Sequence, residues 1–377
     1  MSIYNPPSLQ HLAVQSLLLN EASTISTLEY LPPHLFPPVF KEAFTGRHMQ
    51  LLKAMVAAWP FSYLPVGALM ETPNVELLQA VLGGVDILQA QKVRPRRWKL
   101  RVLDLRNMTQ DFWDVWPSRK NLYCSTETES QEQVSSKLRR DVKVVTDLSL
   151  RFHLKEHQTC LLQWAQERKV CVLLCCVKME FCDFPGEIIK EILDIFPPDN
   201  IEKMELSTNH VLPLLGHIAS HFGHMTELRE CHLTHIFLNR DMAVNTLAVT
   251  EISVVFSKFG VTHLRFLLEN TADTLQTLEL VNCKMEDSEL SALLPALSQC
   301  SQLTTVNFCD KDFSSAVLKK LLQSVANLSN LTVEFYPPPL ECYDPLEVFA
   351  QLCPELLDIP LAKRQPKTNS LCYRHLP

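Results

Sequence analysis

The sequence predicts an α/β fold in which strand–helix units repeat and stack into a curved solenoid, a horseshoe of the ribonuclease-inhibitor-like kind. The prediction rests on an apolar pattern that occurs three times between residues 275 and 336. Residues 275–283 read LQTLELVNC, and the spacing starts again 28 residues later at Leu303 and once more from Leu328. Leucines spaced LxxLxLxx(N/C), returning every ~20–29 residues, define a leucine-rich repeat, whose units must stack to bury their apolar faces.

Earlier segments show the same spacing and extend the repeats towards the N-terminus. Residues 201–209 read IEKMELSTN and fit the full pattern, and Leu228 begins a further unit 27 residues later. The next clear unit, at Leu275, follows after 47 residues, which is too long for one unit and too short for two. We therefore expect a weak strand near Leu247 that extends to Ile252.

The remaining patterns divide the chain into three expected parts. Residues 1–97 form a helical cap, residues 98–336 hold the repeats, and residues 337–377 form a C-terminal cap and tail. A polar segment without periodicity, residues 124–140, is expected to be an exposed insertion. The first strand is expected over residues 100–105. Expected helices cover residues 49–58, 74–91, 159–168 and 345–357.

Composition narrows the class of protein. Hydrophobic residues make up 46% of the 377, which is typical of a globular chain. The net charge of −7 argues against a general nucleic-acid surface, and eight glycines make phosphate-binding glycine loops improbable. No apolar run reaches membrane-spanning length. The 13 cysteines include no CxxC pair, and several of them fall at expected strand positions: Cys175, Cys231, Cys283 and Cys309. We therefore expect reduced thiols that pack in the core of an intracellular, cytoplasmic protein.

The N-terminal segment carries a helical pattern with two interpretations. Ser8 can cap a helix that begins at Leu9, and Leu9, Ala13 and Leu17 recur at i, i+4 and i+8. This spacing resembles the elongin C-binding box of cullin ligase adaptors, in which a leucine fills an apolar pocket and a small residue permits close approach. The alternative is a helix that packs against its own domain.

Two short motifs follow the helix. Leu31-Pro32-x-x-Leu35 resembles a cullin-2 box, and residues 36–40 (FPPVF) fit the same loose pattern. The basic string KVRPRRWK at residues 92–99 has two interpretations, a solvated connector that leads into the first strand or a nuclear-localisation signal, so nuclear residence is a second possibility.

Longer segments resemble one family across nearly the whole chain. Residues 93–100 (VRPRRWKL) and 111–113 (DFW) carry the most specific similarity, and LPALSQCSQL at residues 294–303 and NLSNL at residues 327–331 continue it. By these residues the chain resembles the PRAME family of leucine-rich proteins. Most relatives carry more repeats between Leu228 and Leu275, so we expect a shorter array here.

The resemblance implies a function. Family members are understood as substrate-recognition subunits of cullin-2 RING ubiquitin ligases, bound through elongin C with elongin B, and with roles in proliferation, differentiation and apoptosis. In that hypothesis Leu9, Ala13 and Leu17 bind elongin, and Leu31, Pro32 and Leu35 bind the cullin. The concave strand face would bind a protein substrate through Lys203, Glu205, Ser207, Glu230, His232, Thr234, Thr277, Glu279, Thr305 and Asn307.

Two other functions compete with this one. Residues 290–294 and 318–322 both match LxxLL, a helical motif that binds nuclear receptors, and the family has been linked to repression of retinoic acid receptor signalling. Both motifs fall where repeat helices must bury their leucines, which favours a core role. The other alternative is a scaffold that binds proteins without a ligase.

The sequence offers no pattern of catalytic or metal-binding chemistry. It contains no GxSxG, HExxH or P-loop motif, so we expect a protein that is not an enzyme and has no cofactor. His217, His221 and His224 have helical spacing but no acidic or cysteine partner nearby in the sequence, and Cys372 with His375 does not make a zinc site. The sequence analysis therefore predicts no metal.

Overall fold

The computed structural model describes residues 8–70, 72–91, 95–107, 113, 142–207, 221, 224–234, 250–255, 261–283, 285–309, 313–342, 346–363 and 366–371. The chain divides into two compact units. Unit 1 contains Met1–Asp147 and Leu154–Cys175, and unit 2 contains Leu148–His153 and Cys176–Pro377. Among the described residues, no helix is long and apolar enough to cross a membrane.

Helices dominate the first part of unit 1. The Ser8 side chain accepts a hydrogen bond from the His11 backbone N–H and so caps the first helix. The Asn74 side chain accepts a hydrogen bond from the Leu77 backbone N–H and so caps the helix that begins at Val75. The helices expected over residues 49–58 and 74–91 are confirmed. The helices are α1 (Leu9–Leu19), α2 (Glu21–Thr27), α3 (Phe36–Thr45), α4 (Met49–Ala57) and α5 (Val75–Ala90), with 3-10 turns η1 (Pro33–Leu35) and η2 (Gly67–Leu69).

An aromatic cluster forms the core between these helices. The ring of Phe40 lies 5.3 Å from that of Trp59 in an edge-on contact and stacks on Trp113 at 5.7 Å. The indole N–H of Trp113 donates to the carbonyl of Pro65 at 3.0 Å, which satisfies its one polar atom inside the apolar core. Phe36 and Phe40 are therefore core residues, and the second candidate cullin motif, residues 36–40, is largely buried.

The strands of unit 1 are parallel and follow the chain order. β1 (Tyr63–Pro65) pairs with β2 (Val102–Asp104), which pairs with the start of β3 (Lys143–Arg151). The strand expected over residues 100–105 is thus present but is the second strand. β1 was not predicted, because it has three residues and ends in a proline. α7 (Glu156–Arg168) belongs to this unit and lies where the helix over residues 159–168 was expected.

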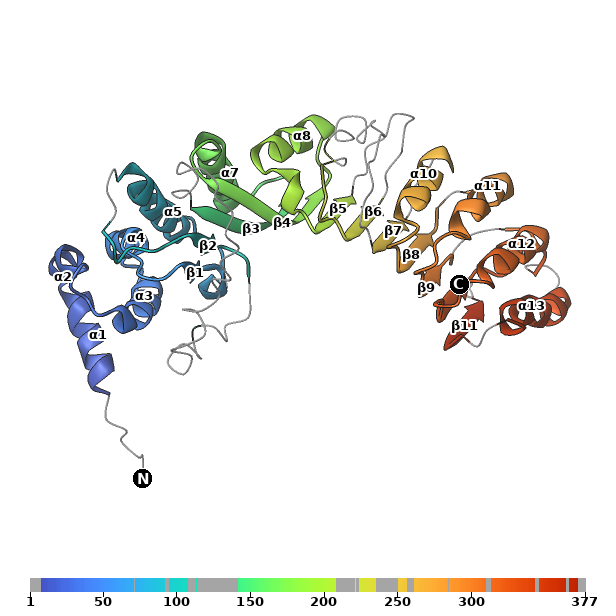
Figure 1. Cartoon of the computed structure of the whole chain (residues 1–377), viewed down its shortest axis with the longest axis horizontal. Coiled ribbons are helices and arrows are strands. Elements are labelled where there is room, and N and C mark those ends of the chain that lie inside the picture. The colour runs from blue at the N-terminus through green and yellow to red at the C-terminus, as the bar shows by residue number, and fades with distance from the viewer. Residues whose placement is uncertain are drawn as a thin grey trace, which may run out of the picture. The chain divides into compact units, whose positions relative to one another are not determined.

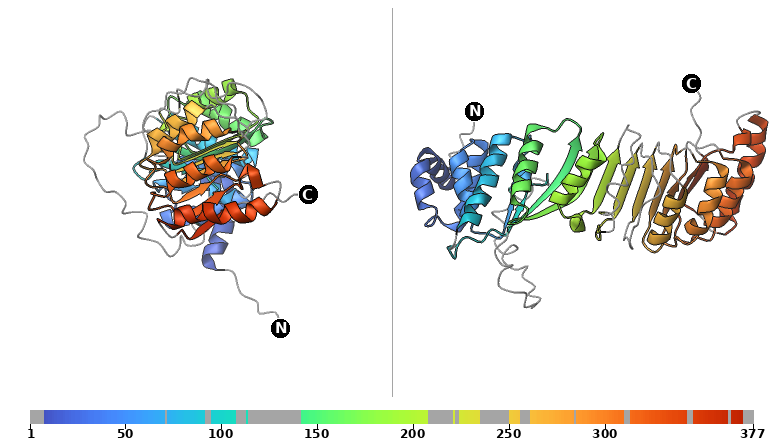
Figure 2. Two further views of the ribbon diagram at one scale, coloured as in Figure 1. Left: turned by 90° about the vertical axis from the view of Figure 1, so that its right-hand side faces the viewer. Right: turned by 90° about the horizontal axis from the view of Figure 1, so that it is seen from above.

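Unit 2 repeats one arrangement, a strand on an open parallel sheet with helices on one face (Figure 1). The strands lie side by side in chain order in the view from above (Figure 2). The strands are β4 (Leu173–Cys182), β5 (Lys203–Ser207), β6 (Glu230–Thr234), β7 (Glu251–Val255), β8 (Thr277–Val281), β9 (Thr305–Asn307), β10 (Val333–Tyr336) and β11 (Thr368–Leu371). The helices are α8 (Gly186–Ile195), α10 (Val261–Thr271), α11 (Asp287–Leu297), α12 (Ser315–Val325) and α13 (Leu346–Leu361), with 3-10 turns η5 (Pro198–Asn200) and η6 (Leu340–Cys342).

Alternate strand residues face the helices and are buried. In β5, Met204 and Leu206 are buried, whereas Lys203, Glu205 and Ser207 are partly exposed. β6 and β8 have the same alternation. A side-chain period of two places one apolar and one polar set on opposite faces of the sheet. The polar set therefore lies on the face away from the helices, as the sequence analysis expected.

Several expectations need correction or lie outside the described residues. The weak strand expected near Leu247 is β7, which contains Ile252 but begins at Glu251. β11 lies in the segment expected to be only a cap and tail. Cys309 is disulfide-bonded, so the prediction of a reduced thiol is wrong there, whereas Cys175, Cys231 and Cys283 carry free thiols. The expected insertion at residues 124–140, together with Leu247, His217, Cys372 and His375, lies outside the described residues.

Candidate functional site

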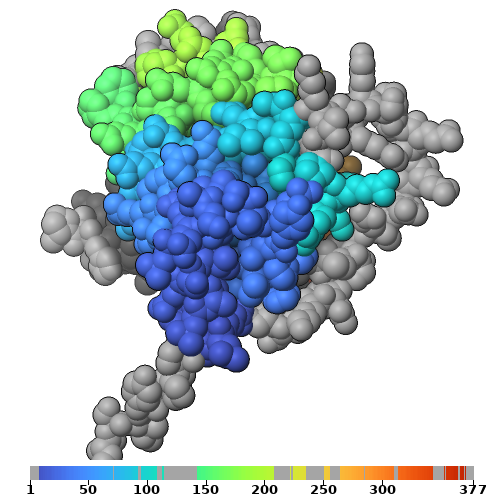
Figure 3. All heavy atoms as spheres, turned by 90° about the vertical axis from the view of Figure 1, so that its left-hand side faces the viewer, coloured from blue at the N-terminus to red at the C-terminus, as the bar shows by residue number. Residues whose placement is uncertain are grey.

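α1 lies at the surface of unit 1 (Figure 3), and several of its apolar side chains are exposed. Leu9 is 86% exposed and Leu19 is 85% exposed, and Leu12 and Ala13 are exposed as well. Within α1, all of which the structure describes, Val14 is the one buried residue. Of the three candidate elongin-binding residues, Leu9 and Ala13 are thus accessible and Leu17 is half-buried. A helix that packed a full apolar stripe on its own domain would bury these leucines.

The candidate cullin segment is partly built into unit 1. Leu31 is buried, Pro32 is exposed and Leu35 is half-buried. The guanidinium of Arg97 donates to the carbonyls of Glu29 and Leu31, the latter at 3.0 Å. Arg97 belongs to the basic string at residues 92–99. Through these two hydrogen bonds, Arg97 holds the backbone of residues 29–31, where the candidate cullin motif begins. The contact favours the structural connector over a localisation signal at this residue.

The strand face of unit 2 brings residues from different repeats into rows. Parallel pairing places Lys203, Glu230, Glu251, Thr277 and Thr305 side by side on successive strands. A second row contains Glu205, His232, Ser253, Glu279 and Asn307. Eight of the ten predicted substrate-face residues lie in these two rows, and the other two, Ser207 and Thr234, pair with each other in a third row. The sequence analysis missed Glu251 and Ser253, because it did not fix where β7 begins.

Charge is concentrated where β5 meets β6. The ammonium of Lys203 lies 2.7 Å from the Glu205 carboxylate and 3.2 Å from that of Glu230. The hydrogen bond to Glu205 raises the pKa of Lys203. Burial is the largest single influence on Glu230 and raises its pKa, but the hydrogen bonds and charges of Lys203 and His232 together outweigh burial and lower the Glu230 pKa. Lys203 is thus charged and held between two carboxylates at neutral pH.

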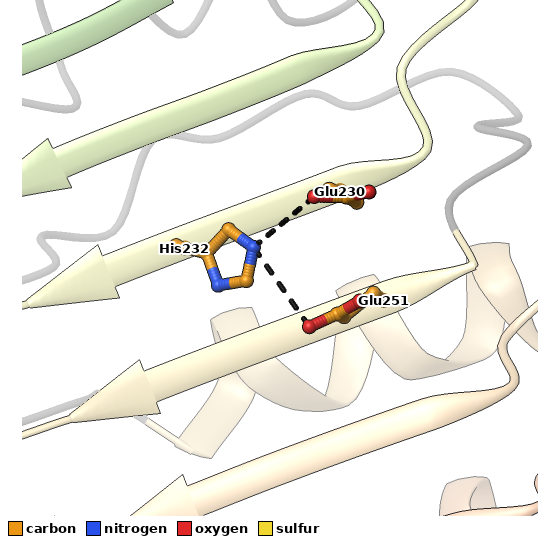
Figure 4. A group of neighbouring side chains, drawn as sticks. All are labelled: Glu230, His232 and Glu251. Carbon is orange, nitrogen blue, oxygen red and sulfur yellow. Dashed lines mark ion pairs between the residues drawn. The ribbon is translucent and has the colours of Figure 1, made fainter.

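A second cluster adjoins the first on β6 and β7 (Figure 4). The Nε2 atom of His232 lies 3.6 Å from Oε2 of Glu230 and 3.8 Å from Oε1 of Glu251. These distances are those of ion pairs and exceed ordinary hydrogen bonds. In the described part of the chain, Nε2 of His232 is one of three buried side-chain polar atoms without a hydrogen-bond partner.

Two other predicted candidates have structural explanations. The leucines of both LxxLL motifs are buried against the sheet: Leu290, Leu293, Leu294, Leu318, Leu321 and Leu322 are each at most 8% exposed. The core role expected for them is confirmed. His221 lies 3.0 Å from Asp194, an acidic partner that the sequence analysis did not find beside the histidines. Asp194 comes from α8, 27 positions earlier, so sequence proximity gave no sign of it.

Comparison with known proteins identifies the class. The family model for the PRAME N-terminal domain matches residues 6–113, and that for the PRAME C-terminal domain matches residues 142–251 and 242–368. The chain belongs to the PRAME family. It is 35% identical to human (Homo sapiens) PRAME family member 20 in an alignment that covers 100% of this chain and 96% of that protein. Mouse (Mus musculus) Oogenesin-3 is 34% identical, with 97% of this chain and 90% of that protein covered.

The alignments also bear on the length of the array. The match to PRAME family member 20 extends over 458 positions, against the 377 residues of this chain, so that relative carries residues that this chain lacks. The C-terminal family model matches in two segments that overlap at residues 242–251, and Glu251 is the first residue of β7. The junction of the two segments falls in the interval where the sequence analysis expected missing repeats.

Proposed function

We propose that this chain is a substrate-recognition adaptor of a cullin-2 RING ubiquitin ligase. In this proposal α1 binds elongin C in its complex with elongin B, the segment around Pro32 contacts the cullin, and the polar strand face of unit 2 binds the protein to be modified. The chain itself performs no chemistry, because the ubiquitin transfer belongs to the other subunits.

The observation that carries the proposal is the exposed apolar side of α1. Leu9 and Ala13 are four residues apart and therefore share one face of the helix, and both are exposed. An amphipathic helix that lays such residues into an apolar groove is a common recognition mode. Val14 holds the helix to unit 1, so the opposite side remains available for a partner.

The strand face supports a protein-binding role. Parallel strands that return every 21–28 residues from β5 to β10, with helices on one face, support a leucine-rich repeat horseshoe. Glu205, Glu230, Glu251 and Glu279 share the open face with Lys203, so the face is net acidic. Charge complementarity then favours a substrate with a basic segment.

The first experiment is titration of the purified full chain with purified elongin B/C complex by isothermal calorimetry. We expect binding by the native chain and a loss of at least about tenfold in affinity for Leu9→Asp, because a carboxylate cannot enter an apolar pocket without its desolvation cost. Leu19→Asp is the matched control, since Leu19 lies on the same helix and is equally exposed.

The outcomes separate the candidate functions. Weaker binding by Leu9→Asp with native binding by Leu19→Asp supports the adaptor and locates its site. Equal loss in both variants would show that the contact is not specific to the Leu9 face of α1, and no loss in either removes α1 as the elongin contact. Absence of binding by the native chain removes the ligase adaptor and leaves the scaffold function. Circular dichroism of each variant verifies that the helices are retained.

A further inference from the structure

We propose that Glu230, His232 and Glu251 form a binding site for one divalent transition-metal ion of the zinc class, with a coordination position open on the polar strand face. The site is independent of elongin binding and goes beyond the adaptor function. It was not predicted from sequence, because Glu251 becomes a neighbour of His232 only through the pairing of β6 with β7.

The geometry of the three ligand atoms suits such an ion. One atom from each residue lies within 4.8 Å of the other two, in the part of the chain that the structure describes. Zinc binds histidine nitrogen and carboxylate oxygen at about 2.0–2.2 Å with tetrahedral angles, which places neighbouring ligand atoms about 3.4 Å apart. The separations of 3.6 Å and 3.8 Å from His232 Nε2 are close to that value. The glutamate side chains are 40% and 35% exposed, so small rotations can close the rest.

The polar groups of the site lack adequate partners within the protein. Nε2 of His232 is buried and has no hydrogen-bond partner among the described residues, which costs free energy unless something binds it. Glu230 and Glu251 lie directly opposite each other on adjacent strands, and like charges in that arrangement destabilise a sheet. A cation bound between the three side chains relieves both conditions.

The local charge also matches a single divalent ion. Lys203 compensates one of the three carboxylates of Glu205, Glu230 and Glu251, so these four side chains together carry a net charge of −2. The 2.7 Å contact of Lys203 with Glu205 does not involve Glu230. Divalent charge is therefore balanced without any further residue.

The ligand types select the class of metal. An imidazole nitrogen favours zinc and its transition-metal neighbours over magnesium and calcium, which prefer sites made of oxygen ligands alone. Three protein ligands leave the fourth tetrahedral position to water or to an incoming group, unlike the four protein ligands of a structural zinc site. On this face the incoming group would be a carboxylate or imidazole side chain of a bound protein.

The test is equilibrium dialysis of the chelator-treated full chain against Zn²⁺, with parallel dialysis against Mg²⁺. Since free thiols of the chain also bind zinc, the readout is the difference between native and variant chains. We expect His232→Ala to hold one zinc equivalent fewer than the native chain. We expect Glu251→Gln, which preserves size, to bind the ion at least about tenfold more weakly, because loss of a ligand exceeds the effect of losing its supporting contacts.

His221→Ala is the matched control, since His221 is also paired with a carboxylate but lies outside the cluster. It should hold as much zinc as the native chain. Cobalt provides a second readout that does not depend on stoichiometry: the visible bands of tetrahedral Co²⁺ should weaken in Glu251→Gln while thiolate-to-metal absorption stays unchanged. Equal zinc uptake by the native chain and by His232→Ala would overturn the proposal. Equal retention of Mg²⁺ and Zn²⁺ at the site would overturn the choice of metal class.

Discussion

The phenol of Tyr63 donates a 2.9 Å hydrogen bond to the carboxylate of Asp104, and this contact joins β1 to β2. Asp104 is 1% exposed, and its second partner is the guanidinium of Arg106 at 2.7 Å. That hydrogen bond raises the pKa of Arg106. A carboxylate so deeply buried is tolerated because Arg106 compensates its charge and Tyr63 donates a hydrogen bond to it.

Removing this carboxylate should destabilise unit 1. We expect Asp104→Ala to lower the free energy of unfolding by about 3 kcal/mol, because Arg106 and Tyr63, which are both partly buried, then lose the buried carboxylate that they bind. Tyr63→Phe, which deletes one hydrogen bond, should cost about 1 kcal/mol. Urea unfolding followed by circular dichroism measures both values. The idea fails if Asp104→Ala costs no more than the exposed control Glu42→Ala.

The contacts of Arg97 should govern the order of the segment before α3. One guanidinium donates to two backbone carbonyls, at Glu29 and Leu31, and a lysine has no planar fork to do the same. Arg97→Ala and Arg97→Lys should therefore both increase amide hydrogen exchange across residues 28–35. Arg96→Ala is the control, because Arg96 is an exposed neighbour in the same string. Identical exchange in the Arg96 and Arg97 variants would show that the contact is dispensable.

Cysteine reactivity should differ sharply along the chain. Burial raises the pKa of Cys231 to about 12 and that of Cys300 to about 12, so both stay protonated and shielded at neutral pH. Cys171 is exposed. Brief treatment of the native chain with iodoacetamide at pH 7.5 should label Cys171 and spare Cys231 and Cys300, as read by peptide mass spectrometry. Labelling of all three at similar rates would contradict the burial.

The same two thiols make stability depend on pH. Their folded pKa values lie above the unfolded value of 9.0, so the unfolded chain loses these protons first. Their contribution is complete below pH 9 and declines as the pH rises towards 12. Cys231→Ser is not a neutral control, because it buries a hydroxyl, whereas Cys231→Ala removes the titration. Urea midpoints at pH 8 and pH 10 should therefore differ less for Cys231→Ala than for the native chain.

The leucines of the LxxLL motifs should act through packing. Leu293 is 1% exposed and Leu318 is 1% exposed, so truncation of either to alanine should lower the free energy of unfolding by about 2–5 kcal/mol. Leu340→Ala, at a residue that is 47% exposed, should cost far less. Thermal unfolding compares the three variants. Native-like stability in Leu293→Ala would reopen the receptor-binding interpretation.

Strands with strong leucine periodicity were predictable from sequence. β5, β6, β8 and β9 fall where the LxxLxL spacing placed them, because each alternates buried apolar and partly exposed residues. β10 lies in the expected segment, but the phase counted from Leu328 was wrong: Val333 and Phe335 are partly exposed, and Glu334 and Tyr336 are buried. β1 and β11 were missed because they have three and four residues and no leucine repeat around them. β7 was located only approximately, since its unit follows β6 after 21 positions instead of 26–28.

The candidate sites show the same limit. The spacing of Leu9, Ala13 and Leu17 predicted that these residues share one face of α1. That this face is largely accessible depends on how little of the helix is covered by the rest of unit 1, which residue spacing does not show. The pairing of His232 with Glu251 depends on the register between two strands, which no local pattern encodes. Likewise the contact of Arg97 with Glu29 joins positions 68 residues apart.

The short interval between β6 and β7 has a consequence for how binding surfaces arise in this family. A relative with additional units at this junction would place other strands beside β6 and would separate the counterparts of His232 and Glu251. Removal of whole units from the array changes no residue on the two strands that flank the removed units. It nevertheless makes those two strands neighbours in the sheet. Loss of sequence can in this way produce a combination of side chains that neither parent repeat possessed.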